Sequence, residues 1–205
     1  MDKTVIDNSE VWFIVNFFSG TLSFEKKEAI VYEIGKRSNY KIFKTEYPLH
    51  AAEIAQKAID LNIHIVVAVG GDGTINEVGT ILRGTEVKMG IIPIGSGNGL
   101  ARHLKIPLNP IKAVAKVYEG NEFEMDTCSI NEFPYLCTAG VGFDAQVAYD
   151  FSHKKSRGFL TYIITSIQTY FSFKCLDCQL VENKKNLNLN AFAITFANAS
   201  QYGND

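Results

Sequence analysis

The stretch VVAVGGDGTINEVGT, residues 66–80, runs from a short apolar segment through a glycine-rich turn into a helical pattern. A strand that enters a helix through glycines can bring backbone N–H groups close to a phosphate, because glycine has no Cβ and tolerates positive φ. This GGDGT turn (70–74) lacks the lysine of the common phosphate-binding loops and carries Asp72 instead. The stretch therefore raises the question of how an acidic turn would hold a phosphate.

Asp72 is the residue of the turn that a purely structural interpretation does not explain. A tight turn accounts for the glycines. A helix starting near Thr74, with Thr74 as N-cap and Glu77 completing a capping box, accounts for those two residues. A carboxylate beside a phosphate is repelled unless a cation lies between them, so Asp72 indicates Mg²⁺ or a proton-transfer partner. Magnesium would also supply the positive charge that a lysine gives elsewhere.

Two further loops have the same character. The segment IPIGSGNGLARHL (92–104) contains the GSGN loop (95–98), and an earlier apolar run ends in the NFFSG loop (16–20). Either loop alone would be weak evidence, because glycines also make ordinary turns. Their placement after strands of the same predicted sheet favours one shared nucleotide site.

The first half of the chain alternates short apolar runs with helical patterns. Such alternation predicts a Rossmann-like α/β fold, with a parallel sheet covered on both faces, and ligands bind beyond the carboxyl ends of such strands. The predicted strands are 11–18, 40–47, 64–70 and 88–95, and the predicted helices are 24–38, 49–62, 74–84, 100–104 and 110–120. The loops after the first, third and fourth strands are thus the expected binding region.

The pattern changes after about residue 122. Strand-like segments at 123–131, 133–143, 173–182 and 190–198 surround one long helical region, about 144–171. We therefore predict an α/β nucleotide-binding domain over 1–122 and a β-rich, sandwich-like second domain over 123–205. Because so few strands close a β-domain poorly, the second domain is expected to be incomplete and the chain to be a fragment.

Composition restricts the partners and the compartment. The 205 residues carry a net charge of −2, which gives no general attraction to nucleic acid. The N-terminus has no signal-peptide core, and no apolar run reaches the length of a transmembrane helix. The four cysteines fit a reducing compartment better than a disulfide framework. A cytoplasmic protein is expected, with no nucleic-acid partner.

The glycine loops and the segment that follows them together resemble a known enzyme family. GGDGTINEV, IPIGSGNGLAR, NFFSG and MDTCSIN…AGVGFDAQV occur in the order seen in the diacylglycerol kinase/sphingosine kinase catalytic superfamily, and most resemble its bacterial lipid-kinase branch. GGDGT alone is shared with NAD kinases and phosphofructokinases, whereas the GSGN loop followed by G-x-D-A is more specific. The resemblance implies a nucleotide domain, a β-rich second domain and transfer of the γ-phosphoryl of ATP to a lipid hydroxyl.

The resemblance also assigns roles residue by residue. It implies that Asp72 faces the metal and the reaction centre, and that Asp126, in EMDTCSI, belongs to the same metal–substrate network. Asp126 could equally be an ordinary strand-end residue. The residues implied to line the nucleotide are Asn16, Ser19, Gly20, Thr45, Gly70, Gly71, Asp72, Gly73, Thr74, Asn76, Ser96, Gly97 and Asn98.

The sequence departs from the family pattern in two places. Phe17 stands where the family usually has proline, which is expected to loosen that turn while leaving Asn16 and Gly20 usable. Gly99 follows Asn98 where many bacterial members have aspartate, so a metal role for that aspartate is missing here. The family's general base and a structural metal site are expected in sequence beyond Asp205.

Two features of the second half bear on a lipid partner. The basic run HKKSR (153–157) is interpreted as a solvated helix end, with contact to anionic headgroups kept open. An apolar stripe at helical spacing is interpreted as core packing, with an acyl-chain groove or membrane-surface contact as the alternative. The stripe consists of Phe159, Tyr162, Ile163, Ile167, Tyr170 and Phe171.

Together these observations predict an ATP- and Mg²⁺-dependent kinase of diacylglycerol or a related lipid, acting peripherally at the inner membrane face. A soluble-substrate kinase of the NAD-kinase type is the enzymatic alternative. A nucleotide-binding regulator without catalysis is the other alternative. The oligomeric state, including a homodimer, is left open.

Overall fold

The computed structural model describes residues 10–20, 22–36, 39–154, 159–182 and 185–200. The chain divides into two compact units. The first unit contains Met1–Cys137 together with Asn198–Asp205, and the second unit contains Thr138–Ala197. Each unit is described separately below.

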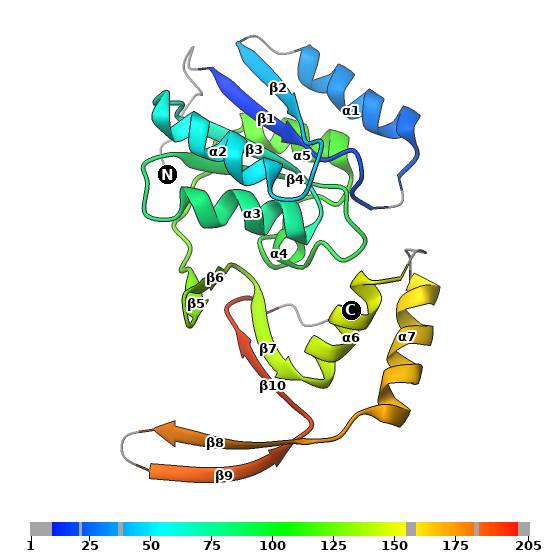
Figure 1. Cartoon of the computed structure of the whole chain (residues 1–205). Coiled ribbons are helices and arrows are strands. Elements are labelled where there is room, and N and C mark those ends of the chain that lie inside the picture. Colours follow the sequence, from blue (N-terminus) through cyan, green and yellow to red (C-terminus); the bar gives the residue numbers. More distant parts are fainter. Residues whose placement is uncertain (1–9, 21, 37–38, 155–158, 183–184, 201–205) are drawn as a thin grey trace. The chain divides into compact units, whose positions relative to one another are not determined.

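The first unit is built on a four-stranded parallel sheet with the order β2-β1-β3-β4 (Figure 1). Its strands are β1 (Val11–Val15), β2 (Tyr40–Lys44), β3 (Ile65–Gly70) and β4 (Lys88–Pro93). The parallel sheet of the predicted Rossmann-like fold is therefore confirmed. The strands are somewhat shorter than predicted, so that residues 16–18 belong to the NFFSG loop.

Successive side chains of a strand point to opposite faces of the sheet, and an apolar cluster covers each face. Trp12 and Ile14 of β1 belong to one apolar cluster, whereas Phe13 and Val15 belong to the other. Ile14 and Phe13 are completely inaccessible to solvent. Burying one such side chain stabilises the fold by about 1.5–3 kcal/mol, which explains why the two central strands, β1 and β3, are apolar throughout.

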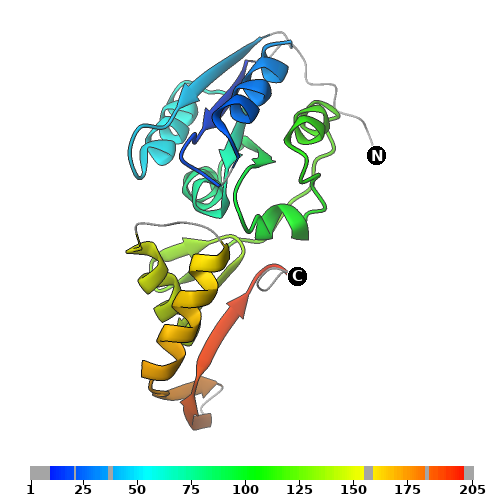
Figure 2. The same ribbon diagram turned by 90° about the vertical axis from the view of Figure 1, so that its right-hand side faces the viewer.

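Helices cover each face (Figures 1 and 2). The helices α2 (His50–Asp60) and α3 (Asp72–Leu82) pack on the face that contains Trp12, and α1 (Phe24–Gly35) and α5 (Pro110–Tyr118) pack on the other. Asn109 caps α5 by accepting the backbone N–H groups of Ile111 and Lys112, and Pro110 occupies the first turn. A short helix, α4 (Gly99–His103), follows the GSGN loop.

The strand order creates a switch point between β1 and β3. From β1 the chain moves outward to β2, and from β3 it moves outward in the opposite direction to β4. In open α/β sheets, the crevice outside the carboxyl ends of two such strands is the usual ligand site. The NFFSG loop and the GGDGT turn follow these two strands.

The rest of the chain contains short antiparallel pairs and two helices. In the first unit, β5 (Cys128–Ile130) pairs with β6 (Phe133–Tyr135). In the second unit, β7 pairs with β10, β8 pairs with β9, and α6 packs against α7. The bounds of these six elements are β7 (Thr138–Gly142), α6 (Phe143–Ser152), α7 (Phe159–Ser172), β8 (Leu176–Glu182), β9 (Lys185–Ala191) and β10 (Ala193–Ala197).

Two details of this half differ from the sequence prediction. The single helical region predicted over 144–171 is two helices, α6 and α7, and residues 155–158 between them lie outside the described residues. Those residues include most of the predicted basic run. Strand β9 was not predicted, because asparagines alternate with leucines in its sequence KNLNLNA and weaken its β propensity.

Helix α7 buries a polar face and exposes an apolar one. Thr165 and Thr169 are 1% and 3% exposed, whereas Ile167 and Phe171 are 54% and 83% exposed. The core-packing interpretation of the apolar stripe is therefore wrong for Tyr162, Ile163, Ile167, Tyr170 and Phe171, which are all exposed. The side chain of Phe159 lies outside the described residues. Helical periodicity predicted the apolar stripe correctly, but it did not predict which face of the helix is buried.

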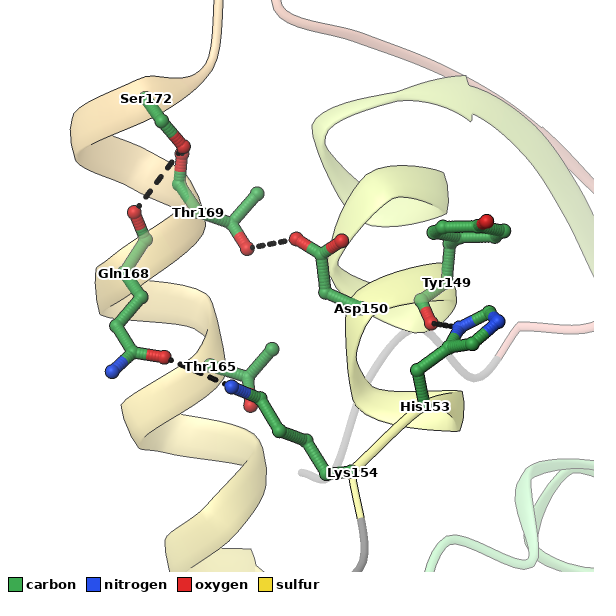
Figure 3. A pocket seen from close by; sticks show the side chains of 8 residues that line it. All are labelled: Tyr149, Asp150, His153, Lys154, Thr165, Gln168, Thr169 and Ser172. Atoms are coloured by element: carbon green, nitrogen blue, oxygen red, sulfur yellow. Dashed lines mark hydrogen bonds between the residues drawn. The ribbon is translucent and has the colours of Figure 1, made fainter.

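A polar seam holds α6 against α7 (Figure 3). Asp150 points from α6 toward α7 and accepts a hydrogen bond of 2.7 Å from the Thr169 hydroxyl. This bond, with one from Gln146, lowers the pKa of the Asp150 carboxyl. Lys154 donates to Gln168 across the same cavity of about 320 Å³. Because these groups already satisfy one another, we interpret the cavity as a helix–helix seam.

Within the part of the chain that the structure describes, no helix has both the length and the apolar character needed to span a membrane.

Candidate functional site

Asn16 organises the NFFSG loop and links it to the GGDGT turn. Its backbone N–H donates to Val69 O at 2.9 Å, which continues the pairing of β1 with β3. Its side-chain Oδ1 accepts the Phe18 N–H at 2.9 Å, closing an Asx turn. Its Nδ2 donates to Thr74 Oγ1 at 3.0 Å, and the Ser19 hydroxyl lies 3.4 Å from the same atom. Asn16, Ser19 and Thr74 thus form one hydrogen-bonded group at the switch point.

Gly20 lets the NFFSG loop pack against the end of β4. Its φ is +65°, and a Cβ at this position would collide with the carbonyl oxygen of Ile94. Only glycine combines this left-handed backbone with so close an approach. The NFFSG loop therefore contacts both the GGDGT turn and the segment that leads into the GSGN loop.

Two lysines hold the NFFSG loop at Phe17, the position where the family pattern has proline. Lys27 is 6% exposed, and its ammonium donates to Phe17 O at 2.6 Å. Burial lowers the pKa of that ammonium. The Lys44 ammonium lies 5.0 Å from the centre of the Phe17 ring, and the Phe24 ring packs against the same side chain. These contacts anchor the turn that the missing proline was expected to loosen.

The GSGN loop meets the GGDGT turn backbone to backbone. A Cβ on Gly95 would lie 2.5 Å from the Cα of Gly71, so the approach requires glycine. Asn98 adopts a left-handed conformation with φ of 55°. Its side chain accepts from Gly95 N at 2.9 Å and donates to Gly95 O at 2.8 Å. Asn98 therefore closes the GSGN loop on itself.

Asp72 joins the GGDGT turn to the GSGN loop. Asp72 is the first residue of α3, and its Oδ2 accepts the backbone N–H of Asn98 at 2.8 Å. A Cβ on Gly97 would lie 3.0 Å from the same oxygen, so this glycine also permits the approach. A carboxylate at a helix N-terminus is stabilised by the helix dipole. Among the described residues, Asp72 Oδ1 has no hydrogen-bond partner, and the side chain is exposed.

The remaining predicted residues of the three loops are distributed around this junction. Thr45 continues β2, and its backbone N–H donates to Val15 O at 3.0 Å, directly beside Asn16. A Cβ on Gly70 would overlap the Thr74 side chain, whereas one on Gly73 would meet none of the described atoms outside its own helix within 4 Å. Ser96 is exposed at the tip of the GSGN loop. The backbone at Gly73 is thus open to an approaching ligand.

Asn76 and Asp126 have other partners. Asn76 lies one turn along α3 from Asp72, and its Oδ1 accepts the Leu136 N–H at 3.3 Å. Asp126 is exposed, and its backbone carbonyl accepts a hydrogen bond of 2.7 Å from Asn198 Nδ2. Among the hydrogen bonds of the described residues, none joins Asp126 to any of the three loops. No sequence motif pointed to Asn198, which lies far along the chain from the glycine motifs.

Cys137 lies close enough to Asp72 to respond to its charge. Burial raises the pKa of the Cys137 thiol, and the Asp72 carboxylate raises it further. Cys137 O accepts the backbone N–H groups of Asn198 and Ala199 at 2.8 and 3.1 Å. The segment around Cys137 therefore lies near the exposed carboxylate of Asp72, a relation that no sequence motif indicated.

The predicted capping box is wrong. Helix α3 begins at Asp72 with Gly71 as its N-cap, and the Thr74 hydroxyl bonds to Asn16 instead. Glu77 accepts the backbone N–H groups of Leu49 and Ala51, at the start of α2. Among the described hydrogen bonds, the side chain of Leu49, the N-cap of α2, makes no cap, and its φ is positive at 67°. Glu77 thus caps a neighbouring helix.

We expect Glu77→Gln to stabilise the protein increasingly as the pH rises. Burial raises the pKa of the Glu77 carboxyl, and the two amide hydrogen bonds only partly oppose that shift. A carboxyl with a raised folded-state pKa contributes stability below its unfolded pKa and loses it as pH rises through the folded pKa. The difference in melting temperature between the variant and the wild type should therefore grow from about pH 4 to about pH 7.

Glu77→Ala is the matched comparison at the same position. It removes the acceptor as well as the charge, so it should destabilise by about 1 kcal/mol, as loss of a helix cap does. Thermal unfolding of both variants across this pH range checks the assignment. The assignment would be contradicted if the difference in melting temperature between Glu77→Gln and the wild type shrank toward neutral pH.

A metal ion bound at Asp72 would be coordinated by few protein side chains. Within the described ranges, no three His, Cys, Asp or Glu side chains form a group that could hold a metal ion. Magnesium at nucleotide sites is commonly held by one or two carboxylates plus substrate phosphates and water. The unpaired Asp72 Oδ1 fits such a ligand set.

Comparisons with known proteins place the chain in a family. The family model of the diacylglycerol kinase catalytic domain matches residues 10–130. A protein of Klebsiella pneumoniae named "Probable lipid kinase YegS-like" is 29% identical over 158 residues, covering 75% of this chain and 53% of the relative. A Staphylococcus aureus protein named "Diacylglycerol kinase" is 30% identical over 130 residues, covering 62% of this chain and 41% of the relative.

A solved structure shares the fold. The crystal structure of a diacylglycerol kinase from Bacillus anthracis matches with a TM-score of 0.71 at 20% identity, covering 95% of this chain and 66% of that one. The chain spans about half the length, or less, of the two curated relatives described above. The match to the family model includes all three glycine loops and Asp126. The chain therefore belongs to the family defined by the diacylglycerol kinase catalytic domain.

Proposed function

We propose that this chain carries the nucleotide-binding part of an ATP- and Mg²⁺-dependent lipid kinase, which transfers the γ-phosphoryl of ATP to a hydroxyl of diacylglycerol or a related lipid. The observation that carries the proposal is the junction of three glycine loops at the carboxyl edge of the sheet, with Asp72 at its centre. Membership in the diacylglycerol kinase catalytic domain family and the names of the relatives support it.

The loops would hold the phosphates mainly through the backbone. Gly73 leaves the first turn of α3 open, so a phosphate could approach its N–H groups and the positive end of the helix dipole. Ser96 is exposed on the facing loop and could donate its hydroxyl. Lys27 and Lys44 reach the NFFSG loop and add positive charge near it. Pre-positioned donors of this kind stabilise the charge on a transferring phosphoryl group.

Asp72 has the geometry for a metal or substrate contact. The Asn98 N–H fixes its Oδ2, which orients Oδ1 without occupying it. When bound, magnesium would neutralise phosphate charge and orient the reacting oxygens. Asp126 is proposed to assist from the segment before β5.

The test is phosphoryl transfer from labelled ATP in the presence of Mg²⁺. Diacylglycerol in mixed micelles and NAD would be offered as acceptors, both to this chain and to the longest chain its gene encodes. The proposal expects labelled lipid and no labelled NAD. Labelled NAD without labelled lipid would support the NAD-kinase alternative. Nucleotide binding without transfer to several lipids would support the regulator.

We also propose that α7 contacts the membrane surface that presents the lipid. Leu160, Ile164, Ile167 and Phe171 recur on one face of the helix and are 70%, 47%, 54% and 83% exposed. An amphipathic helix with such a face can lie in the plane of the bilayer interface. The buried threonine face, hydrogen-bonded to α6, leaves this apolar face outward.

Leu160→Asp combined with Phe171→Asp should therefore reduce binding to phospholipid vesicles at least about tenfold, because each large apolar side chain contributes about 1.5–3 kcal/mol when buried. The melting temperature should stay close to that of the wild type, since both side chains are already exposed. Tyr32→Asp is the matched control, because this aromatic is 71% exposed on α1. Vesicle co-sedimentation measures the effect. Equal binding by the double variant and the control would refute the proposed contact.

A further inference from the structure

Asn198 is the residue at which the chain re-enters the first unit after β10. Its side chain makes three hydrogen bonds: Nδ2 donates to Asp126 O at 2.7 Å and to Leu136 O at 2.9 Å, and Oδ1 accepts from Cys128 Sγ at 3.4 Å. Its backbone N–H donates to Cys137 O at 2.8 Å. One side chain therefore ties together the segment before β5, strand β5 itself and the segment after β6.

Asparagine is suited to this position because its amide has two donors and one acceptor oxygen. Both donors meet backbone carbonyls, and the oxygen meets a thiol. An aspartate would direct an acceptor oxygen at the carbonyls of Asp126 and Leu136 and lose both bonds. An alanine would leave these carbonyls without their partner.

The network continues from Asn198 to the phosphate turn. The carbonyl of Leu136 is held by Asn198, and its N–H donates to Asn76 Oδ1 on α3. Asn76 lies four residues after Asp72, so the two side chains share one face of the helix. The chain of contacts Asp126–Asn198–Leu136–Asn76 therefore runs from one predicted metal-binding aspartate to the helix that begins with the other.

We propose that Asn198 is a positioning residue, which fixes the backbone at Asp126 relative to α3 and so sets where the Asp126 carboxylate stands with respect to Asp72. This inference rests on the proposed lipid kinase function, in which both carboxylates serve one metal–substrate network. Two carboxylates can share one ion only if their spacing is held, because Mg²⁺ demands nearly ideal octahedral geometry with ligand distances of about 2.0–2.1 Å.

A neighbouring contact supplies a matched control. Ser200, two residues further on, contacts a different residue. Its hydroxyl lies 2.9 Å from His103 Nδ1, and its backbone N–H donates to the same nitrogen at 3.0 Å. Ser200→Ala removes a side-chain contact of the same segment without touching Asp126 or Leu136. Its effect measures what loosening this segment does by itself.

The experiment compares wild type, Asn198→Asp, Asn198→Ala and Ser200→Ala in the longest chain that the gene encodes. Hydrogen exchange of the metal-free proteins is followed in peptides that cover residues 124–137. Steady-state phosphoryl transfer to diacylglycerol is measured as a function of Mg²⁺ and of ATP. Far-UV circular dichroism checks that each variant is folded.

Both Asn198 variants should exchange faster than wild type over 124–137, whereas Ser200→Ala should not. We expect kcat to fall at least tenfold and the Mg²⁺ concentration for half-maximal rate to rise at least fivefold. The KM for ATP should stay within twofold, because the described hydrogen bonds of Asn198 involve none of the three loops. A general loss of stability would not change the magnesium dependence while leaving the KM for ATP unaltered.

Unchanged exchange in the Asn198 variants, or unchanged kcat and magnesium dependence in folded variants, would overturn the proposal. So would loss of the fold in both variants, which would make Asn198 a folding residue. If the wild type phosphorylates no lipid while the exchange result is as expected, the proposed function fails and the structural part of the inference stands.

Discussion

Asp72→Asn is expected to lower the rate of phosphoryl transfer by roughly 10²–10⁴-fold, the range associated with loss of a positioned acid–base group. The amide oxygen of asparagine can still accept the Asn98 N–H that now binds Asp72 Oδ2 at 2.8 Å. The junction of the GGDGT turn with the GSGN loop should therefore persist. What the variant loses is the negative charge at Oδ1, on which the proposed metal or hydroxyl contact depends.

The measurement is the rate of transfer to diacylglycerol, together with nucleotide affinity and melting temperature. Asp60→Asn is the matched control, since Asp60 is an exposed aspartate near the end of α2, hydrogen-bonded to Gln56. The control should retain the wild-type rate. Retention of more than half of the wild-type rate by Asp72→Asn would show that this carboxylate is not part of the chemistry.

Gly20→Ala is expected to be the most destabilising single change in the three loops. Its left-handed backbone costs an L-residue about 1–2 kcal/mol, and forcing a methyl group against the Ile94 carbonyl adds about 1–3 kcal/mol, as overpacking does. The NFFSG loop would have to move away from the end of β4. Denaturant unfolding should show a loss of about 2–5 kcal/mol, with nucleotide binding lost as well.

Gly73→Ala provides the opposite case within the same group of loops. Within the part of the chain that the structure describes, a Cβ there meets no atom outside its own helix within 4 Å, and the residue lies in the first turn of α3. Because alanine favours helix over glycine, stability should be unchanged or rise by up to about 1 kcal/mol. If phosphates approach this backbone, nucleotide affinity should nevertheless fall at least tenfold. Unchanged affinity in this folded variant would place the phosphates elsewhere.

The sequence determined the parallel sheet and the loops at its carboxyl edge. Apolar runs alternating with helical patterns allow little else, because the central strands of a sheet covered on both faces must be apolar throughout. The glycines of the three loops were also visible in the sequence, and the structure gives two of them a specific reason: a Cβ on Gly20 or Gly95 would collide with the backbone of a neighbouring segment.

Only the tertiary structure decided which polar groups meet. Thr74 and Glu77 have the spacing of a capping box, yet Thr74 bonds to Asn16 and Glu77 caps α2, because partners from other elements compete with local ones. The apolar stripe of α7 was visible in the sequence, but helical periodicity cannot tell a face that packs inside from one that stays exposed. Asn198 joins Asp126 across a sequence separation of 72 residues. Local sequence sets backbone preference and periodicity, whereas a hydrogen bond between distant residues exists only once the packed chain has brought donor and acceptor together.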